Sequence, residues 1–586
     1  MAEEQTIGSI LLADCGTVMT KVILLDQVNG QYRLVAQGEA PTTSEYPWGD
    51  VTEGIRHAIE QITEITGRTF LDGQGDIITP EQDARYGVDA FAATTSASPP
   101  LSVVLGGVTR DLSVASAERA VSGTYSHIKA ILSAERREDA MSEEAFVRTI
   151  REARPDVICV AGGTDGGATV PVLNLVKSVA IACALMEEGI RPQVLYAGNV
   201  QLRQRIANLL KDRVTVRMAD NVRPTLTEEN LADAQAELNA LYLQRKMSLL
   251  PGFDVLNSWV QLPIEPSATM FARLIRYLWH LGDPTRGVLG VDVGAANTTI
   301  VAVFNGRPYL TIQGGMGSAF GGKSLLRRRR GQPVVRWMPE DVDIEEAYGV
   351  LLNAEMRPAT IQQDMRELRL AHSLARETLR AALAIARPGW QAGEAEIAPD
   401  LLPLCDTILV SGNVLTRAPW PGQTALILLD ALEPVGITTM VLDMYGVSSV
   451  LGSVAAIKPL AAVGALDNGA LVNLATVIAP IGRARRGDVA LRVRVTYDDG
   501  GTLEIESHYG EIDMVSLLPG REAELEIRPT RRFDVGFGGP GKKGKRRVSG
   551  GLAGLIVDAR GRPLRLPRDA GRRQMQLRRW LWDVGS

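Results

Sequence analysis

Two short segments, far apart in the chain, carry residue types that suit the binding of a phosphate chain. Asp14 to Lys21 read Asp-Cys-Gly-Thr-Val-Met-Thr-Lys, and Asp292 to Thr299 read Asp-Val-Gly-Ala-Ala-Asn-Thr-Thr. Each segment places an aspartate at the end of an apolar run, small residues in a turn, and hydroxyl groups beyond it. Such a carboxylate suits Mg²⁺, which binds through its water shell beside phosphates. Two turns of this kind, if they faced each other, would clamp one nucleotide.

Both segments are predicted to be the turns of β-hairpins. Strands are expected at 9–13 and 21–25 around the first turn, and at 287–292 and 300–304 around the second. The separation of the two hairpins is far too long for a solenoid repeat and fits a duplicated domain. A strand at 407–410 ends in Ser411-Gly412-Asn413, another strand is expected at 438–442, and a helix at about 365–387. The second half is therefore predicted to be α/β.

A βαβαβ unit is predicted between the hairpins. Its strands are expected at 156–161, 193–197 and 214–218, and its helices at 170–188 and 201–212. The first strand ends in a glycine-rich turn, which is a natural place for an anion or the backbone of a partner. The same glycines can also serve the turn's own geometry, and both interpretations stay open. The residues of this possible partner or ligand site are Gly162, Gly163, Thr164, Asp165, Gly166 and Asn199.

Beyond about residue 469 the pattern changes to strict alternation of apolar and polar residues. The runs 489–497 and 523–527 are typical of strands with one buried face. They predict a separate, mostly antiparallel β domain. The predicted division is 1–275, containing the βαβαβ unit at about 155–220, then 276–468, and then a β-rich extension at 469–586.

Composition excludes several classes of protein. The formal net charge of −5 gives no reason to expect nucleic acid or an anionic membrane as a partner. Four scattered cysteines form neither a disulfide framework nor a metal motif. No signal peptide or apolar run of spanning length is present, so a cytoplasmic protein is expected. Basic runs at 327–330 and 542–547 are most often solvated surface.

A second glycine-rich segment competes for the phosphate role. Residues 317–324 read Gly-Ser-Ala-Phe-Gly-Gly-Lys-Ser and satisfy the spacing of a P-loop. A P-loop should follow the first strand of its own α/β domain, whereas this segment follows the second hairpin. We therefore favour a glycine-rich turn near the terminal phosphate of a nucleotide held by the hairpins.

Together these motifs resemble the phosphate-1, phosphate-2 and adenosine motifs of the superfamily of sugar kinases, heat-shock chaperones and actin. The resemblance implies duplicated actin-like, ribonuclease H-like ATPase domains that close around ATP and Mg²⁺, with Asp14 and Asp292 as catalytic residues that hold Mg²⁺ through water. Ala295 and Ala296 replace the usual glycines, and Thr299 stands where an acidic residue is common, which indicates slow hydrolysis. The implied cofactor-binding residues are Gly16, Thr17, Thr20, Lys21, Gly294, Asn297, Thr298, Ser411, Gly412 and Asn413.

Four segments resemble the glutamate mutase L family, the accessory proteins of adenosylcobalamin-dependent glutamate mutase. They are 12–21, 93–123, 160–167 and 195–199, and the likeness covers about the first 460 residues. It implies a chaperone that uses ATP to reactivate a cobalamin-dependent mutase, its protein client, and leaves an oligomer open. No histidine here stands in the Asp-x-His-x-x-Gly cobalamin-binding signature, so the chain is not the mutase itself. A small-molecule kinase with Asp165 as base, or an actin-like assembly protein, stays an alternative.

Overall fold

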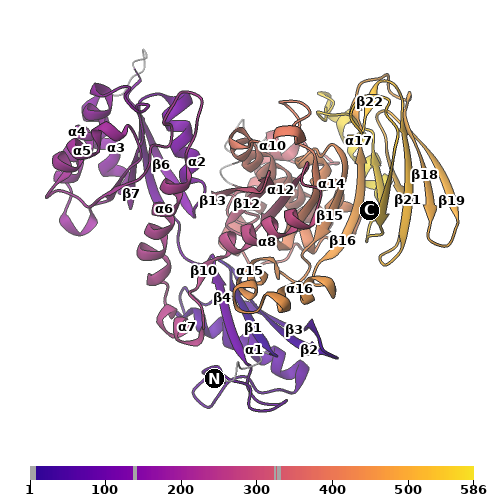
Figure 1. Cartoon of the computed structure of the whole chain (residues 1–586), viewed down its shortest axis with the longest axis horizontal. Helices are drawn as coiled ribbons and strands as arrows, with labels where there is room; N and C mark the ends of the chain where they lie inside the picture. Colours follow the sequence, from indigo (N-terminus) through magenta and orange to yellow (C-terminus); the bar gives the residue numbers. More distant parts are fainter. Residues whose placement is uncertain (1–7, 136–141, 323–324, 326–331, 586) are drawn as a thin grey trace. The chain divides into compact units, whose positions relative to one another are not determined.

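The computed structural model describes residues 8–135, 142–322, 325 and 332–585. The chain divides into two compact units (Figure 1). Unit 1 consists of Met1–Ala97, Asp254–Leu310 and Gly315–Ser586, and unit 2 of Ser98–Phe253 and Thr311–Gly314. Within the described ranges, no helix is both long enough and apolar enough to cross a membrane.

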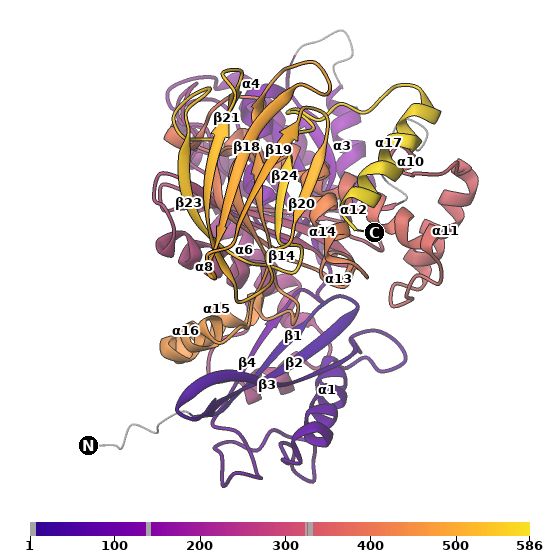
Figure 2. The same cartoon turned by 90° about the vertical axis from the view of Figure 1, so that its right-hand side faces the viewer.

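The first half of unit 1 is built on a five-stranded sheet with the order β3-β2-β1-β4-β10, of which β1, β2, β3 and β4 are labelled in Figure 2. Its first three strands form an antiparallel meander, and β4 and β10 run parallel to β1. Helix α1 (Val51–Thr66) packs on this sheet; Asp50 caps its first turn, and Gly67 ends it with φ 69°. The strands are β1 Ile10–Cys15, β2 Met19–Val28, β3 Gln31–Pro41, β4 Ala90–Thr95 and β10 Glu265–Pro266.

The second half repeats this plan. Strands β13-β12-β11-β14-β15 follow the same order, with β11 antiparallel to β12 and parallel to β14, and β14 parallel to β15. The repeated order confirms the predicted duplicated α/β fold, and the predicted hairpins and the helix at 365–387 are present. The elements are β11 Gly287–Val293, β12 Asn297–Phe304, β13 Arg307–Gly314, β14 Cys405–Ser411, β15 Gly436–Leu442, α8 Ser267–Leu281, α12 Met365–Ala386, α14 Pro421–Ala431, α15 Ser448–Ile457 and α16 Pro459–Asp467.

The C-terminal region is antiparallel β structure for the most part, as predicted, but it is not separate from the second half. Strands β16, β24 and β20 extend the second sheet to eight strands, and β16 pairs with β15 along its length. The predicted boundary at 469 therefore falls inside one continuous sheet. The alternating pattern showed which faces are buried but not which strand each edge joins. These strands are β16 Val472–Ala479, β20 Ile512–Val515 and β24 Leu555–Asp558.

A four-stranded sheet, ordered β19-β18-β21-β23, packs by its apolar face onto this extension through a shared core that includes Ile478 and Leu555. The chain ends in helix α17 (Ala570–Asp583), which the sequence analysis did not predict. The buried Trp580 of α17 packs in the core of the second half. The strands are β17 Ile481–Gly482, β18 Val489–Tyr497, β19 Thr502–His508, β21 Glu522–Pro529, β22 Phe533–Asp534 and β23 Gly544–Ser549.

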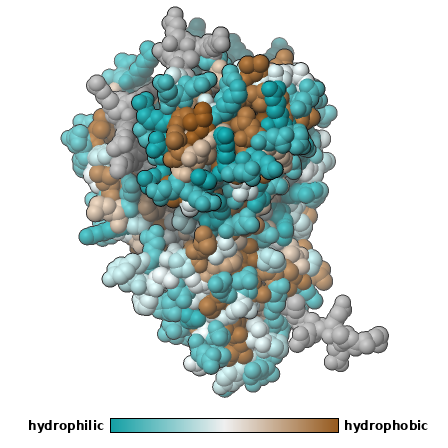
Figure 3. Space-filling view, turned by 90° about the vertical axis from the view of Figure 1, so that its left-hand side faces the viewer, coloured by the Kyte–Doolittle hydropathy of each residue, from teal (hydrophilic) through white to brown (hydrophobic). Residues whose placement is uncertain are grey.

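Unit 2 is a doubly wound α/β domain. Its five strands are all parallel in the order β6-β5-β7-β8-β9, with α3, α4 and α5 on one face and α2 and α6 on the other (Figure 1). The βαβαβ prediction is confirmed, and two earlier strands, β5 and β6, join it. Figure 3 shows hydrophobic side chains gathered on the part of unit 2 that faces the viewer. The elements are β5 Leu101–Gly107, α2 Ala115–Val121, β6 Ser126–Ser133, α3 Glu143–Ala153, β7 Val157–Val160, α4 Val170–Ala184, β8 Gln193–Tyr196, α5 Arg203–Leu210, β9 Val216–Met218 and α6 Ala232–Arg245.

Candidate functional site

The two hairpin turns have the same closure. The Gly16 N–H donates to the Met19 carbonyl at 3.0 Å, and the Gly294 N–H donates to the Asn297 carbonyl at 3.0 Å. A Cβ on Gly16 would lie 2.7 Å from the Met19 oxygen, so a side chain does not fit there; on Gly294 the corresponding distance is 3.2 Å. The chain therefore builds one backbone device twice, as the sequence indicated.

Strand register places four residues of each half in a row across neighbouring strands. The first row is Lys21, Asp14, Thr94 and Glu265, on β2, β1, β4 and β10. The second row is Thr299, Asp292, Ser411 and Asp443, on β12, β11, β14 and directly after β15. In-register neighbours point to the same face of a sheet, so each row brings its side chains together. Both rows contain an aspartate, then a hydroxyl, then a second carboxylate; they differ at lysine versus threonine.

In the first row, hydroxyl groups fix the carboxylate of Asp14. Its Oδ1 accepts hydrogen bonds from Thr94 Oγ1 at 2.8 Å and from Ser267 Oγ, at the start of α8, at 2.7 Å. Lys21 Nζ donates to Asn413 Oδ1 at 3.0 Å. The first hairpin is thereby tied both to α8 and to the turn after β14.

In the second row, the carboxylate of Asp292 is electrostatically unfavourable. Burial is the largest cause that raises the pKa of Asp292 to about 7, the carboxylates of Asp14 and Asp443 raise it further, and Lys21 lowers it. These influences require Asp14 and Lys21 of the first hairpin to lie near Asp292 of the second. The two rows are thus close to each other within unit 1, as the hydrogen bond from Lys21 to Asn413 also shows.

Asp443 also holds the start of helix α15. Its Oδ1 accepts from the Val447 N–H at 2.8 Å and its Oδ2 from the Ser448 N–H at 2.9 Å. Ser411 Oγ donates to Asp443 Oδ2 at 3.1 Å. Each row is therefore linked to the N-terminus of one helix, the first to α8 and the second to α15.

The predicted adenosine turn lies against the second hairpin. Gly412 has φ 97°, and a Cβ there would lie 2.2 Å from the Val293 oxygen. Only glycine allows this approach of the two backbones. The structure thus places Ser411, Gly412 and Asn413 beside the predicted phosphate-binding turns.

The P-loop-like segment covers the second turn. The Ser318 N–H donates to the Gly294 carbonyl at 2.9 Å, and the Ala319 N–H to the Ala295 carbonyl at 3.0 Å. The segment follows β13, which comes third in its half, and not the first strand of a separate α/β domain. This position matches the favoured interpretation of the segment. Lys323, Ser324 and the basic run 327–330 lie outside the described residues.

Two of the predicted phosphate-binding hydroxyls lie on the opposite face of the sheets. Thr20 pairs with Cys15 and Thr298 with Val293, one position away from the aspartates, and side chains alternate between faces along a strand. Both threonines are fully buried, and their hydroxyls bond to Thr42 Oγ1 and to the Met316 carbonyl. The difference from prediction arises because the sequence shows hydroxyls but not their register.

The Thr17 hydroxyl is also engaged: it donates to the Ser96 carbonyl at 3.1 Å. In the first hairpin, Lys21 is the residue whose side chain lies on the same face of the sheet as Asp14. In the second turn it is Thr299, which the sequence analysis treated only as a departure from the superfamily pattern.

Sequence reasoning missed Thr94, Ser267, Glu265 and Asp443. Burial raises the pKa of Glu265, while Arg273 lowers it. Thr94 is the last residue but one of β4 and Asp443 directly follows β15, so a search for polar residues at the carboxyl ends of buried strands would have found both. Glu265 belongs to a two-residue strand, which has no detectable period.

The glycine-rich turn after β7 lies in unit 2, and its contacts are internal. A Cβ on Gly162 would lie 2.7 Å from Val108 Cγ2, and one on Gly163 would lie 2.5 Å from the Ala168 oxygen. These two glycines are therefore required by the packing of the loops themselves.

Polar residues of the same turn link neighbouring loops. Asp165 Oδ1 accepts from Asn221 Nδ2 at 2.9 Å and from the Val200 N–H at 3.1 Å. The buried Asn199 accepts through Oδ1 from the Gly166 N–H at 3.4 Å. Thr164 contributes a hydrogen bond within the turn, because its carbonyl accepts from the Gly167 N–H. Asp165 is thus engaged in holding three loops together.

The donor groups suit a cation that keeps its own water. Within the described part of the chain, no cluster of three or more His, Cys, Asp or Glu side chains could hold a metal ion directly. Asp14 and Asp292 offer hard carboxylate oxygens, which Mg²⁺ prefers, and Mg²⁺ commonly takes its remaining ligands from water and phosphate. The two rows therefore fit a magnesium–nucleotide complex.

Comparison with known proteins gives a family. A family model described as MutL protein matches residues 10–469. Protein MutL of Clostridium tetanomorphum is 25% identical over 302 residues, which cover 51% of this chain and 58% of that protein, so the match spans less than two thirds of the relative.

Solved structures show only weak likeness. Nucleotide-free acetone carboxylase aligns at 10% identity with TM-score 0.31, covering 86% of this chain and 81% of its own. Gluconate kinase from Lactobacillus acidophilus aligns at 10% identity with TM-score 0.29, covering 78% and 92%. These values are too low to carry an argument about function.

Proposed function

Because this chain belongs to the MutL protein family, we propose that it is a Mg²⁺-dependent ATP-binding protein that reactivates a cobalamin-dependent mutase such as glutamate mutase. The observation that carries the nucleotide part is the surroundings of Asp292, which include Asp14 and Lys21 of the other hairpin. Two hairpins that serve one space are suited to one triphosphate. The mutase part rests on the resemblance to the glutamate mutase L family.

The residues divide the work of holding the nucleotide. Backbone N–H groups of the two turns and the Lys21 ammonium bind phosphate oxygens, and the turn at Gly412 and Asn413 lies beside the adenosine. Asp14 and Asp292 are the carboxylates that would hold Mg²⁺ through its water shell. Mg²⁺, when bound, neutralises phosphate charge and thereby eases cleavage of the terminal phosphate.

Glu265 is the proposed group that orients the attacking water. It lies in the same row as Asp14, and burial raises its pKa, which makes it a better proton acceptor than an exposed glutamate. Hydrolysis is slow in this proposal, because Thr299 occupies the register position where the first row has a lysine and supplies neither a cation nor a second base. A slow ATPase fits a chaperone better than a metabolic kinase.

A packed helix pair supplies the path from nucleotide to client. Ser267 begins α8 and bonds to Asp14, while Asp443 caps α15. The two helices lie in close contact, since a Cβ on Gly452 of α15 would lie 2.4 Å from the Met270 oxygen of α8. A change at either row would therefore shift this pair, and such shear between packed helices is a common way to transmit nucleotide state.

The mutase proposal is tested with purified adenosylcobalamin-dependent glutamate mutase that has been inactivated by turnover. Addition of this chain with Mg·ATP and fresh adenosylcobalamin should restore mutase activity. A non-hydrolysable ATP analogue in place of ATP should not restore it. Asp14→Ala should abolish the recovery, whereas Glu64→Ala, at an exposed position of α1, should leave it unchanged. Full recovery without nucleotide would remove ATP from the proposal.

Two simple measurements separate the alternatives. A kinase should consume ATP strongly with one small metabolite, while a reactivase should respond to a protein. An actin-like assembly protein should sediment as large polymers with ATP. Neither alternative has a specific observation in its favour. For the kinase, the candidate base Asp165 is already engaged with Asn221 and Val200.

We further propose that the glycine-rich edge of unit 2 contacts the client. Gly162, Gly163, Thr164, Asp165, Gly166 and Asn199 lie at the carboxyl ends of parallel strands, where α/β domains present their binding loops. Asp165→Ala should loosen the three loops that it links and weaken client recruitment about tenfold without changing ATP affinity. Recruitment measured by surface plasmon resonance that is equal in variant and wild type would refute this role.

A further inference from the structure

The C-terminal extension carries a dense group of exposed cations that the nucleotide site does not use. Three loops contribute to it: 483–488, 530–532 and 538–543. We call it the basic patch and define it by seven exposed residues. They are Arg483, Arg485, Arg486, Arg531, Arg532, Lys542 and Lys543.

Backbone contacts hold the three loops together. Strand β17 pairs with β22, Ile481 with Asp534 and Gly482 with Phe533, which joins the first loop to the second. The Gly541 N–H donates to the Phe533 carbonyl at 2.9 Å, and a Cβ on Gly541 would lie 3.2 Å from the Arg531 Cα, which joins the second loop to the third. The basic patch is therefore one surface and not three separate runs.

Few opposite charges lie in these loops. Among the described residues, the ion pair that they show is Arg532 with Asp488, at 3.8 Å. Asp534 is a carboxylate next to these loops, and it accepts from the Gly536 N–H at 2.7 Å. Like charges held close together repel one another, and among the described residues this one ion pair is set against seven cations.

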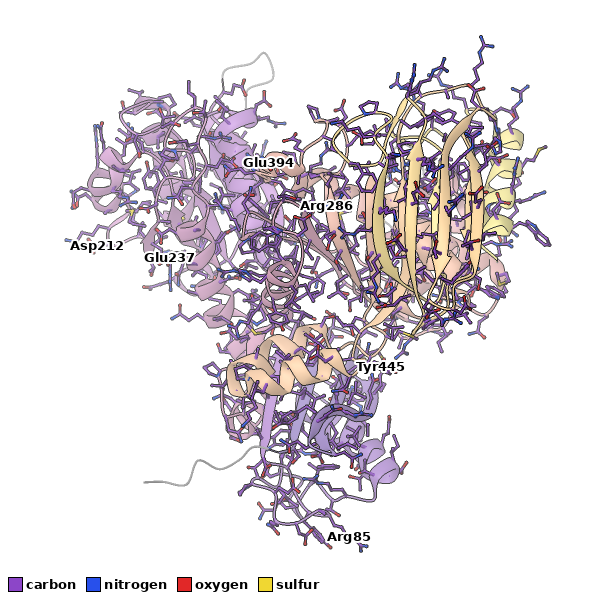
Figure 4. All side chains as sticks on the ribbon, turned by 45° about the vertical axis from the view of Figure 1, so that its right-hand side comes forward. Arg85, Asp212, Glu237, Arg286, Glu394 and Tyr445 are labelled. Atoms are coloured by element: carbon purple, nitrogen blue, oxygen red, sulfur yellow. The ribbon has the colours of Figure 1, made fainter. Side chains whose placement is uncertain are left out.

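The adjoining four-stranded sheet shows the opposite arrangement. Its outer face, which is turned toward the viewer in Figure 4, matches cations with acids across strands. Arg492 pairs with Glu506, Arg494 with Glu504, and Lys545 with Glu524. The uncompensated cations are thus confined to the loops at one end of the sheet.

We propose that the basic patch is the docking surface for an acidic protein segment or acidic face of a partner. Arginine predominates in it, and its planar guanidinium binds carboxylates with two parallel hydrogen bonds. Charge complementarity of this kind steers association and selects partners. The surface lies beyond residue 469, where the family match ends, so the partner is tied to the extension and not to the family at large.

The loops favour a protein over other polyanions. Their aromatic residues are not exposed: Phe533 is buried, and Phe537 is half-buried against Gly544. A single-stranded nucleic acid site normally offers aromatic faces for base stacking, and a membrane-binding loop offers apolar side chains for insertion. Within the described loops, neither feature is present at the surface. This inference does not rest on the proposed ATP site.

The test uses the full-length protein and fluorescent poly-L-glutamate as the probe. Binding should be measurable at low salt and should weaken steeply toward about 0.15 M salt, because surface charges are screened. The quadruple variant R485E/R486E/K542E/K543E should lose affinity about tenfold or more. The affinity of the milder variant R485Q/R486Q/K542Q/K543Q for poly-L-glutamate should lie between those of the wild type and the glutamate variant.

A matched variant controls for net charge. K177E/R205E/K211E/R213E changes the charge by the same amount at exposed positions of unit 2, and it should keep poly-L-glutamate affinity within about twofold. Equal losses in both quadruple variants would overturn the proposal. A short RNA, or vesicles containing phosphatidylserine, binding more tightly than poly-L-glutamate would overturn the choice of partner class. Circular dichroism spectra of both quadruple glutamate variants check that each keeps the wild-type fold.

Discussion

The first and second rows share a backbone plan and differ in charge. Both place an aspartate beside a closed hairpin turn, followed by a hydroxyl and a second carboxylate. In the first row, Asp14 receives two hydroxyl hydrogen bonds and lies next to Lys21. In the second row, Asp292 lies near two other carboxylates, and its pKa is raised to about 7.

This difference teaches that duplication preserved the backbone of the turn while the side chains around it diverged. The first row is already satisfied within the protein and supplies a fixed anchor. In the second row, the buried carboxylates repel one another when no cation is present, and a bound Mg²⁺ would offset this repulsion. Four pairs of variants break or sharpen this comparison.

The largest effect is expected at the far ends of the rows. Glu265→Gln should lower ATP turnover about 100-fold, since general base groups commonly contribute that much, and leave ATP affinity unchanged. Asp443→Asn, at the equivalent place in the second row, should lower turnover far less because Asp443 caps α15. Steady-state hydrolysis and equilibrium ATP binding measure the two effects. Equal losses of turnover would contradict the division of tasks.

The next effect concerns the position at which the rows differ. Lys21→Met should weaken ATP binding about 30-fold, because it removes a cation from the triphosphate and a hydrogen bond to Asn413. Thr299→Val should weaken it about threefold or less. Fluorescent-nucleotide titration compares both variants. A stronger loss with Thr299→Val would show that the second row is the main phosphate anchor.

Removing the charge of Asp292 and removing that of Asp14 should change the stability of the nucleotide-free protein in opposite directions. Because the native pKa of Asp292 lies above its unfolded value, its protonated form stabilises the fold at low pH, and this contribution is lost as pH rises through about 7. Asp292→Asn should therefore raise the melting temperature by about 2–4 °C at pH 8, with little change at pH 4.

Asp14→Ala should instead lower the melting temperature at both pH values, because Thr94 and Ser267 lose their acceptor. Differential scanning fluorimetry in the presence of EDTA measures both variants. A stabilising Asp14→Ala would show that the carboxylates of the first row repel one another as well.

A modest effect on turnover should come from the positioning hydroxyl. Ser267→Ala leaves one of the two hydrogen bonds on Asp14 and should lower turnover only about threefold to tenfold. Ser267→Thr should restore most of the rate, because it keeps the donor. A turnover assay distinguishes this from a folding defect, which the conservative variant would not rescue.

Much of this site could be predicted from sequence because its signals are local. Both hairpins, their aspartates, the turn at Ser411–Asn413 and the parallel βαβαβ unit are visible as strand patterns broken by small residues. The repeated strand order then follows from two copies of one pattern.

What the sequence did not provide depends on pairing between distant strands. The side on which Thr20 and Thr298 point is set by register, and Glu265 gains its place only through its pairing with Thr94. For the same reason, β16 was assigned to a separate domain although it joins β15. Long-range pairing is specified by packing and not by local propensity.

One measurement tests the central claim most directly: isothermal titration of ATP with Mg²⁺ into the nucleotide-free protein. The two rows predict a single site per chain, lost both in Asp14→Ala and in Asp292→Ala although these residues belong to different halves. Retention of wild-type affinity in either variant, or two independent sites that each variant removes one at a time, would contradict it.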